Sequence, residues 1–176
     1  MTDQFQPVIR SLFVLGGARS GKSRYAQARA EASPLDLVFV ATAEPFDDEM
    51  AERITRHQAD RGPRWSTVEA RIELAGAILE HSRPDRLLLI DCLTLWTSNL
   101  MLSGRDITVA TEELQRAIST AAGPIIFVAN EVGLGIVPDN ALARRFRDEA
   151  GRINQAVAVS VDEAQLIVAG LPVRLK

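Results

Sequence analysis

One stretch of eight residues has the spacing of a phosphate-binding loop. The segment "GGARSGKS", residues 16–23, fits the pattern G-x-x-x-x-G-K-[ST], with Gly16, Gly21, Lys22 and Ser23 at its fixed positions. Glycines let the backbone curl so that successive N–H groups face an anion, and the helix that follows adds the positive end of its dipole. We expect Lys22 to reach the β- and γ-phosphates of a nucleotide and the Ser23 hydroxyl to bind Mg²⁺.

A carboxylate follows an apolar run later in the chain. The segment "RLLLID" ends in Asp91, as is typical of the acid that holds Mg²⁺ directly or through water beside a phosphate loop. A strand-terminal Asp is also often a helix cap, so the metal role of Asp91 depends on the loop that precedes it. The two histidines, His57 and His81, and the single cysteine, Cys92, have no zinc-site spacing.

The elements that must position these residues alternate along the chain. Short apolar runs predict strands at 12–16, 37–41, 86–91, 125–130 and 165–170. Amphipathic segments predict helices at 22–32, 47–61 and 72–81, one or two between 93 and 122, and a long one from about Asp139, an expected N-cap. The end of the chain predicts a turn at 170–172 and a short edge strand. Continuously apolar strands that alternate with helices predict a mainly parallel sheet, with ligands at the carboxyl ends of its strands.

Bulk composition restricts the classes of protein. A length of 176 residues suits a single domain, 1–176, and the net charge of −3 with a pI of about 5.5 argues against a broad nucleic-acid surface. One cysteine allows no intrachain disulfide, and the sequence shows neither a signal peptide nor an apolar run of membrane-spanning length. We therefore expect a cytoplasmic protein with no nucleic-acid partner and no membrane span.

A nucleotide site leaves several functions open. A GTP-dependent switch is disfavoured, because "NEVG" at 130–133 lacks the Lys and Asp of N-K-x-D, and "CLT" follows Asp91 where D-x-x-G would need its glycine. A small-molecule kinase, a nucleotidyltransferase, a plain ATPase and a nucleotide-regulated binding protein remain.

Four longer blocks resemble one enzyme family. They are "GGARSGKSRYA", "ATAEPFDDEMAERITRHQADRG", "LLLIDCLTLW" and "NEVGLGIVPDNALARRFRDEAGRINQ". Together they resemble the bifunctional adenosylcobinamide kinase/adenosylcobinamide-phosphate guanylyltransferases of cobalamin biosynthesis, over nearly the whole chain. The resemblance implies an α/β fold, P-loop NTPase-like (RecA-like), with a mainly parallel sheet flanked by helices and a short C-terminal edge strand.

The same resemblance implies two reactions and their partners. ATP or GTP phosphorylates adenosylcobinamide; GTP then gives GMP to a histidine, which passes it to adenosylcobinamide phosphate, with pyrophosphate released and Mg²⁺ required. The guanylylated histidine corresponds to His57. The resemblance also implies a homo-oligomer, a trimer.

His57 suits that chemistry, although its pattern alone favours another interpretation. On a helix over 47–61 it shares a face with Met50 and Ile54, and a lone histidine there is ordinarily a packed core residue. A neutral imidazole is nevertheless a nucleophile near neutral pH, whereas a lysine is mostly protonated. Its attack on the α-phosphorus gives a phosphoramidate, which predicts ping-pong kinetics.

Further positions gain their roles mainly from the resemblance. The implied nucleotide contacts, besides the loop positions already named and Asp91, are Gly17, Ala18, Arg19, Ser20, Ala41, Thr42, Ala43, Gln58, Ala59, Asp60, Arg61 and Glu69. Glu69 could accept hydrogen bonds from the N1–H and 2-amino group of guanine, although an exposed carboxylate is the alternative. The loop 130–140 is expected to shape the substrate cleft. The arginines at 144, 145, 147 and 152 either assist anion binding or form a solvated helix face or a subunit contact.

Overall fold

A single twisted sheet organises the part of the chain that the computed structural model describes, residues 10–43 and 62–176. Its strand order is β3-β2-β4-β5-β1-β6-β7, and all pairs are parallel except β6–β7. The strands are β1 (Ser11–Gly16), β2 (Asp36–Ala41), β3 (Trp65–Glu69), β4 (Arg86–Asp91), β5 (Ile125–Asn130), β6 (Glu163–Val168) and β7 (Leu171–Arg174).

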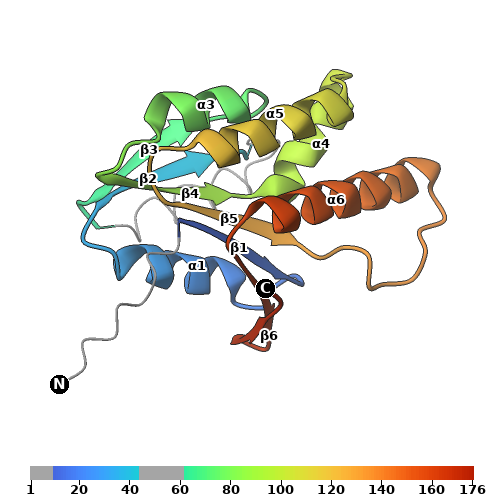
Figure 1. Ribbon diagram of the computed structural model, residues 1–176. Coiled ribbons are helices and arrows are strands. Elements are labelled where there is room, and N and C mark those ends of the chain that lie inside the picture. Colours follow the sequence, from blue (N-terminus) through green and yellow to red (C-terminus); the bar gives the residue numbers. More distant parts are fainter. Residues whose placement is uncertain (1–9, 44–61) are drawn as a thin grey trace.

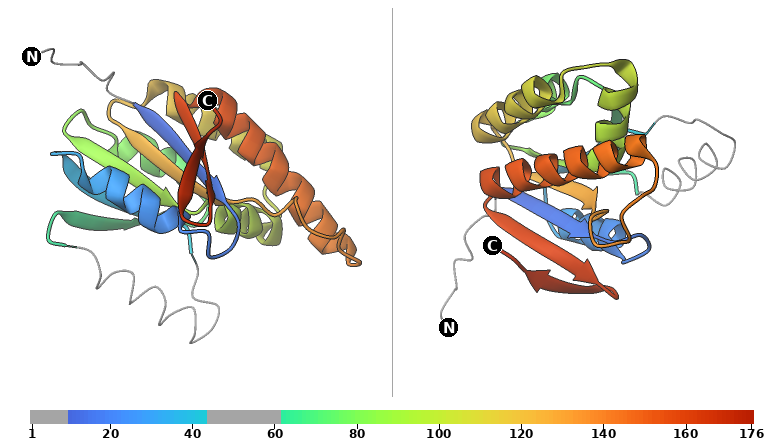
Figure 2. Two further views of the ribbon diagram at one scale, coloured as in Figure 1. Left: turned by 90° about the horizontal axis from the view of Figure 1, so that it is seen from below. Right: turned by 90° about the vertical axis from the view of Figure 1, so that its right-hand side faces the viewer.

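Helices cover the sheet unequally in the described part (Figures 1 and 2). They are α1 (Lys22–Glu31), α3 (Leu74–His81), α4 (Leu93–Ser103), α5 (Ile107–Thr120) and α6 (Ala141–Ser160). Figure 1 shows α3, α4, α5 and α6 on one face and α1 on the other. This is the two-faced covering that a parallel sheet requires.

Two hydrophobic clusters correspond to the two faces. Successive residues of a strand point to opposite sides, so in β4 Leu88 and Ile90 join the cluster under α3–α6, whereas Leu87 and Leu89 join the cluster that contains α1. Among the residues that the structure describes, Trp96 on α4 is the largest fully buried side chain. The same alternation assigns a face to every polar residue at a strand end.

The predicted strands and helices are largely confirmed, with three corrections. Strand β3, "WSTVE", was not predicted, because its burial is intermediate to exposed and its residues are mostly polar. The strand predicted at 165–170 lies at Glu163–Val168, because Ala169 and Gly170 adopt positive φ in the turn before β7. The cap of α6 is Asn140, not Asp139: its side chain accepts hydrogen bonds from the amides of Leu142 and Ala143.

The C-terminal strand is short and lies at the edge, as predicted, and it runs antiparallel; the turn predicted at 170–172 lies instead at Ala169 and Gly170, because β7 begins at Leu171. It pairs with β6 from Gln165↔Arg174 to Val168↔Leu171. The turn between β6 and β7 lies against the phosphate loop, since the amide of Gly170 donates to the carbonyl of Ser20 at 2.8 Å. A segment more than 140 residues away along the chain therefore supports that loop.

Candidate nucleotide-binding site

The phosphate loop joins β1 to α1, as its sequence predicts. Gly21 precedes the helix with φ +94°, a left-handed conformation that glycine adopts without strain. Gly16 is required by space: a Cβ there would lie 2.6 Å from Ser20 Oγ and 2.8 Å from the carbonyl oxygen of Ile167. Both fixed glycines of the motif thus have a local structural reason.

The charged and polar groups of the loop are arranged around its backbone. Lys22 Nζ donates to the carbonyl of Gly17 at 3.2 Å, so the ammonium lies back over the loop. Gly17, Ala18 and Arg19 are exposed, and Arg19 has a positive φ of 57°. Exposed N–H groups at a helix N-terminus beside a lysine form an anion-binding site.

The helix that follows the loop is fixed to the sheet by an ion pair. Arg29 on α1 binds Glu163 on β6 through two hydrogen bonds of 3.3 Å, and also donates to the Tyr25 hydroxyl at 2.9 Å. Burial of the Glu163 carboxylate opposes ionisation, but hydrogen bonds from Arg29 and Gln165 outweigh it and lower the pKa of Glu163. The pair therefore keeps its charges at neutral pH.

Three of the predicted site residues form a row at the carboxyl ends of neighbouring strands. Glu69 on β3 pairs with Ala41 on β2, which pairs in turn with Asp91 on β4. The row continues through Val128 of β5 to Val14 of β1. With about 4.8 Å between strands, Asp91 lies roughly 10 Å from the phosphate-loop strand and Glu69 roughly 19 Å.

The side chains of Asp91 and Glu69 also point to the face of the sheet that α1 covers. Leu87 and Leu89 belong to the cluster on the α1 side, so Asp91, two residues further along the strand, points the same way. The same reasoning directs Glu69 to that face, because Trp65 packs there. The loop, Asp91 and Glu69 consequently share one edge and one face, a grouping that follows from the strand order.

Asp91 and Ser23 fit the needs of a magnesium ion. Mg²⁺ in nucleotide sites uses one or two protein ligands and takes its remaining ligands from phosphates and water. In the described residues, groups of three or more histidines, cysteines or carboxylates that could hold a metal without a nucleotide are absent. Ser23 supplies a hydroxyl at the start of α1, and Asp91 supplies a carboxylate at the end of β4, the strand next to β5. These two groups match the one or two protein ligands of a magnesium ion in a nucleotide site.

The segment 41–43 contributes differently from one residue to the next. Thr42 is fully buried, and its hydroxyl donates to the Cys92 carbonyl at 2.7 Å while it accepts from the Cys92 amide at 2.8 Å. Its own carbonyl accepts from Asn99 at 2.8 Å. Thr42 thus fastens β2 to the segment after β4, and the nucleotide contacts of the neighbouring Ala41 and Ala43 stay a prediction.

Glu69 lies in the open at the edge strand. Its side chain is 69% exposed and makes an ion pair of 3.2 Å with Arg71. An acceptor in that position can still bind two donors in one plane, as the edge of guanine requires, because a carboxylate accepts several hydrogen bonds.

Cys92 is unsuited to nucleophilic chemistry. It lies directly after Asp91, and burial, with the nearby Asp91 charge, raises the pKa of its thiol to about 11. The thiol stays protonated at neutral pH and serves as a small apolar group in the α1-side core.

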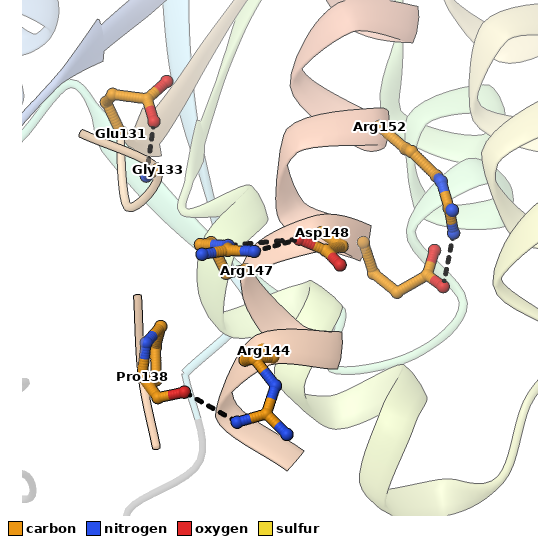
Figure 3. A network of polar contacts seen from close by, with 8 residues as sticks. Glu131, Gly133, Pro138, Arg144, Arg147, Asp148 and Arg152 are labelled. Atoms are coloured by element: carbon orange, nitrogen blue, oxygen red, sulfur yellow. Dashed lines mark hydrogen bonds and ion pairs between the residues drawn. The ribbon is translucent and has the colours of Figure 1, made fainter. Parts of the chain in front are cut away.

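The arginines of α6 are mostly engaged in local contacts (Figure 3). Arg144 donates to the carbonyls of Pro138 and Asp139 at 2.8 and 2.7 Å, Arg147 pairs with Asp148, and Arg152 pairs with Glu149. Arg144 thereby fixes the end of the loop after β5. The roles expected for these arginines, in anion binding, on a solvated helix face or in a subunit contact, stay predictions.

Five predicted residues, His57, Gln58, Ala59, Asp60 and Arg61, lie outside the described residues. The predicted helix over 47–61 lies outside them as well. The chain leaves the described part after Ala43, just past the carboxyl end of β2.

Two other features of the described residues lie apart from this edge. A groove of about 370 Å³ runs between α3 and α5 and is lined by none of the predicted site residues. Among the described helices, none has the length and apolar character needed to cross a membrane.

The fold and the site together define a class. A glycine-rich loop joins β1 to α1, and an acid ends β4, which is separated from β1 in the sheet by β5. This arrangement makes the chain an α/β protein of the P-loop NTPase-like class. Within that class, the model of the cobinamide kinase / cobinamide phosphate guanyltransferase family matches residues 12–175. The chain belongs to this family.

Curated relatives are similar over nearly the full length. The bifunctional adenosylcobalamin biosynthesis protein CobP of Pseudomonas aeruginosa is 44% identical over 165 residues, which cover 93% of this chain and 95% of that protein. The corresponding CobU proteins of Salmonella typhimurium and Escherichia coli are 39% and 38% identical, over 94% of this chain and 99% of each relative.

Solved structures show the same fold at low identity. An ATPase from the type III secretion system of pathogenic bacteria superposes with a TM-score of 0.57 at 14% identity, over 94% of this chain and 56% of that one. A protein from Pyrococcus horikoshii OT3 gives 0.53 at 10% identity, over 95% and 86%. Both share the fold of this chain.

Proposed function

We propose that this protein phosphorylates adenosylcobinamide with ATP or GTP and then converts adenosylcobinamide phosphate to adenosylcobinamide-GDP. The observation that carries the proposal is the family match across residues 12–175. The phosphate loop agrees with it, because Gly21 has a positive φ and Gly16 leaves no room for a Cβ. Curated relatives of matching length are bifunctional proteins of adenosylcobalamin biosynthesis.

In the first reaction the loop holds the triphosphate. Loop amides and Lys22 bind the β- and γ-phosphates, which withdraws charge from the bond that breaks. The hydroxyl of the aminopropanol arm attacks the γ-phosphorus, the bond from that phosphorus to the bridging oxygen breaks, and the nucleoside diphosphate leaves. The hydroxyl proton passes to solvent. Mg²⁺ held by Ser23 and Asp91 would neutralise phosphate charge in this step.

In the second reaction His57 is the nucleophile. Its ring nitrogen attacks the α-phosphorus of GTP, a P–N bond forms, and pyrophosphate leaves. A phosphate oxygen of adenosylcobinamide phosphate then attacks the same phosphorus and releases the imidazole. Two displacements in series give ping-pong kinetics. Within this proposal Glu69 selects guanine by accepting from its N1–H and 2-amino groups, and Gln58–Arg61 with Ala41–Ala43 complete the nucleotide contacts.

A small-molecule kinase without guanylyl transfer is the rival function. Incubation with adenosylcobinamide, Mg²⁺ and either ATP alone or ATP with GTP separates the two, with products identified by mass spectrometry. We expect adenosylcobinamide phosphate with ATP alone, and adenosylcobinamide-GDP with pyrophosphate once GTP is added. Formation of the phosphate without the GDP product would establish the rival. No corrinoid product under either condition would refute both.

We also propose that the protein is a homo-oligomer, a trimer. Support comes from the loop after β5, where Leu134 and Ile136 are 85% and 98% exposed, since apolar patches on a surface often mark contacts between chains. Light scattering should give the mass of a trimer, and Ile136→Asp should lower it. A monomeric wild type would refute this.

A further inference from the structure

The hairpin of β6 and β7 touches the phosphate loop at three points. The amide of Gly170 donates to the carbonyl of Ser20 at 2.8 Å. A Cβ at Gly21 would lie 3.3 Å from the Cα of Gly170. A Cβ at Gly16 would lie 2.8 Å from the carbonyl oxygen of Ile167, its strand partner in β6. On the hairpin side all three contacts are made by main-chain atoms, so they act on the course of the loop backbone.

The hairpin is also held at its open end. Strand β7 pairs with β6 over four residue pairs. Beyond them, Lys176 Nζ donates to the carbonyls of Ala158, Val159 and Val161 at 3.3, 3.0 and 2.6 Å, where α6 ends. The turn at Gly170 therefore has a defined position from which it can hold the loop.

The Gly170 hydrogen bond determines the direction of one loop amide. The peptide bond between Ser20 and Gly21 is trans, and in a trans peptide the carbonyl and the N–H point in opposite directions. Because the Ser20 carbonyl points at Gly170, the N–H of Gly21 points away from the hairpin. Gly21 is the N-cap of α1, and N–H groups at a helix N-terminus are placed to bind phosphates.

The conformation of Gly170 makes this contact sensitive to substitution. Its φ is +81°, in the left-handed region, and among the described residues no atom lies within 4 Å of the place that its Cβ would take. A side chain at position 170 would thus meet no obstacle there. The backbone conformation is what disfavours it, since most L-residues are strained at positive φ and asparagine tolerates it best.

We propose that Gly170 positions the phosphate loop for the nucleotide: its N–H holds the Ser20 carbonyl, which directs the Gly21 N–H toward the phosphates. The inference rests on the proposed function, because it needs a nucleotide in the loop. Gly170 acts through Ser20 and Gly21, so it is a positioning residue. Since both proposed reactions use a triphosphate held in the same loop, loss of this contact should raise the KM for the nucleotide in both.

A graded series at position 170 measures the contribution, with calorimetry and the β,γ-imido analogue of ATP as the probe. Gly170→Asn keeps the N–H and tolerates the conformation, so the affinity should stay within about twofold of the wild type. Gly170→Ala keeps the N–H but strains the turn, and should weaken binding by about threefold. Gly170→Pro removes the donor and should weaken binding by about tenfold, the upper range for one hydrogen bond.

Gly104, which follows α4, is the matched control. Its φ is +69°, its Cβ would also meet no atom of the described residues within 4 Å, and its amide donates to carbonyls of α4 and not to the phosphate loop. Gly104→Ala and Gly170→Ala should lower the Tm by similar amounts, about 2–4 °C. Only the change at Gly170 should weaken nucleotide binding, which a purely structural role would not produce.

Wild-type affinity in a folded Gly170→Pro variant, or equal losses of affinity in the two alanine variants, would overturn the inference. If Gly170→Pro does not fold, the milder variants decide, and wild-type affinity in Gly170→Ala would contradict the proposed role. A wild type that fails to bind the analogue would instead refute the proposed function, so the two failures are distinguishable.

Discussion

The candidate nucleotide site runs along the carboxyl ends of the strands from β1 to β3, and its two ends are built in different ways. At the β1 end the site consists of backbone: glycines set the curve of the loop, and the turn at Gly170 supports it through the carbonyl of Ser20. At the β2–β3 end the site consists of side chains on an exposed edge strand, with Glu69 facing solvent and Arg71 beside it. In the proposed function, binding of the phosphates therefore depends on backbone conformation, whereas the choice of base depends on single side chains.

The largest effect should come from the phosphate end. Lys22→Ala removes the ammonium that we propose contacts the phosphates in both reactions, so both rates should fall by about 100-fold or more, as for other preorganised electrostatic groups. Steady-state assays of each product would measure this. Arg24→Ala is the control, because Arg24 is exposed on the same helix and should leave both rates nearly unchanged. Unchanged kinase turnover in Lys22→Ala would contradict the role given to the loop.

A smaller effect should appear in stability at the same end. Glu163→Gln leaves Arg29 without its carboxylate, which should lower the free energy of unfolding by about 2 kcal/mol, as for other hydrogen bonds to charged groups. Because the folded-state pKa of Glu163 is lowered, its contribution is full above the pKa of the unfolded chain and is lost as the pH falls through the folded-state value.

Denaturant unfolding at about pH 7 and at about pH 3 tests this sign, since the two values bracket the ordinary pKa of a glutamate. The wild type should lose more stability on acidification than Glu163→Gln does. Equal losses would show that this carboxylate does not contribute to the acid sensitivity of the fold.

The smallest expected effect lies at the β2–β3 end of the site, where Glu69 is proposed to bind the guanine base. Glu69→Ala should reduce the preference for GTP over ATP in the guanylylation step about tenfold, because one exposed carboxylate supplies about 1–1.5 kcal/mol of discrimination in water. Competition between the two nucleotides measures it. Glu80→Ala removes a comparably exposed carboxylate at the far end of α3 and should change nothing. If Glu69→Ala keeps full selectivity, guanine is recognised elsewhere.

The same contrast explains what the sequence could predict. The phosphate loop is local: eight consecutive residues between a strand and a helix carry both its chemistry and its conformation, so Gly16, Gly21 and Lys22 could be placed in advance. Asp91 could be placed because a continuous apolar run identified β4 as a buried strand.

What the sequence could not show depends on strand order and long-range contacts. The row Glu69–Ala41–Asp91 exists because β3, missed for its polar and exposed residues, pairs with β2. The contact of Gly170 with Ser20 joins segments distant along the chain.

The central claim is a covalent GMP bound to His57, and labelled GTP tests it directly. The protein is incubated with Mg²⁺ and GTP carrying label at either the α- or the γ-phosphate, then denatured and separated from free nucleotide. We expect acid-labile label on the wild type from α-labelled GTP, none from γ-labelled GTP, and none on a folded His57→Ala variant. Absence of α-label on well-folded wild type, or equal label on His57→Ala, would contradict it.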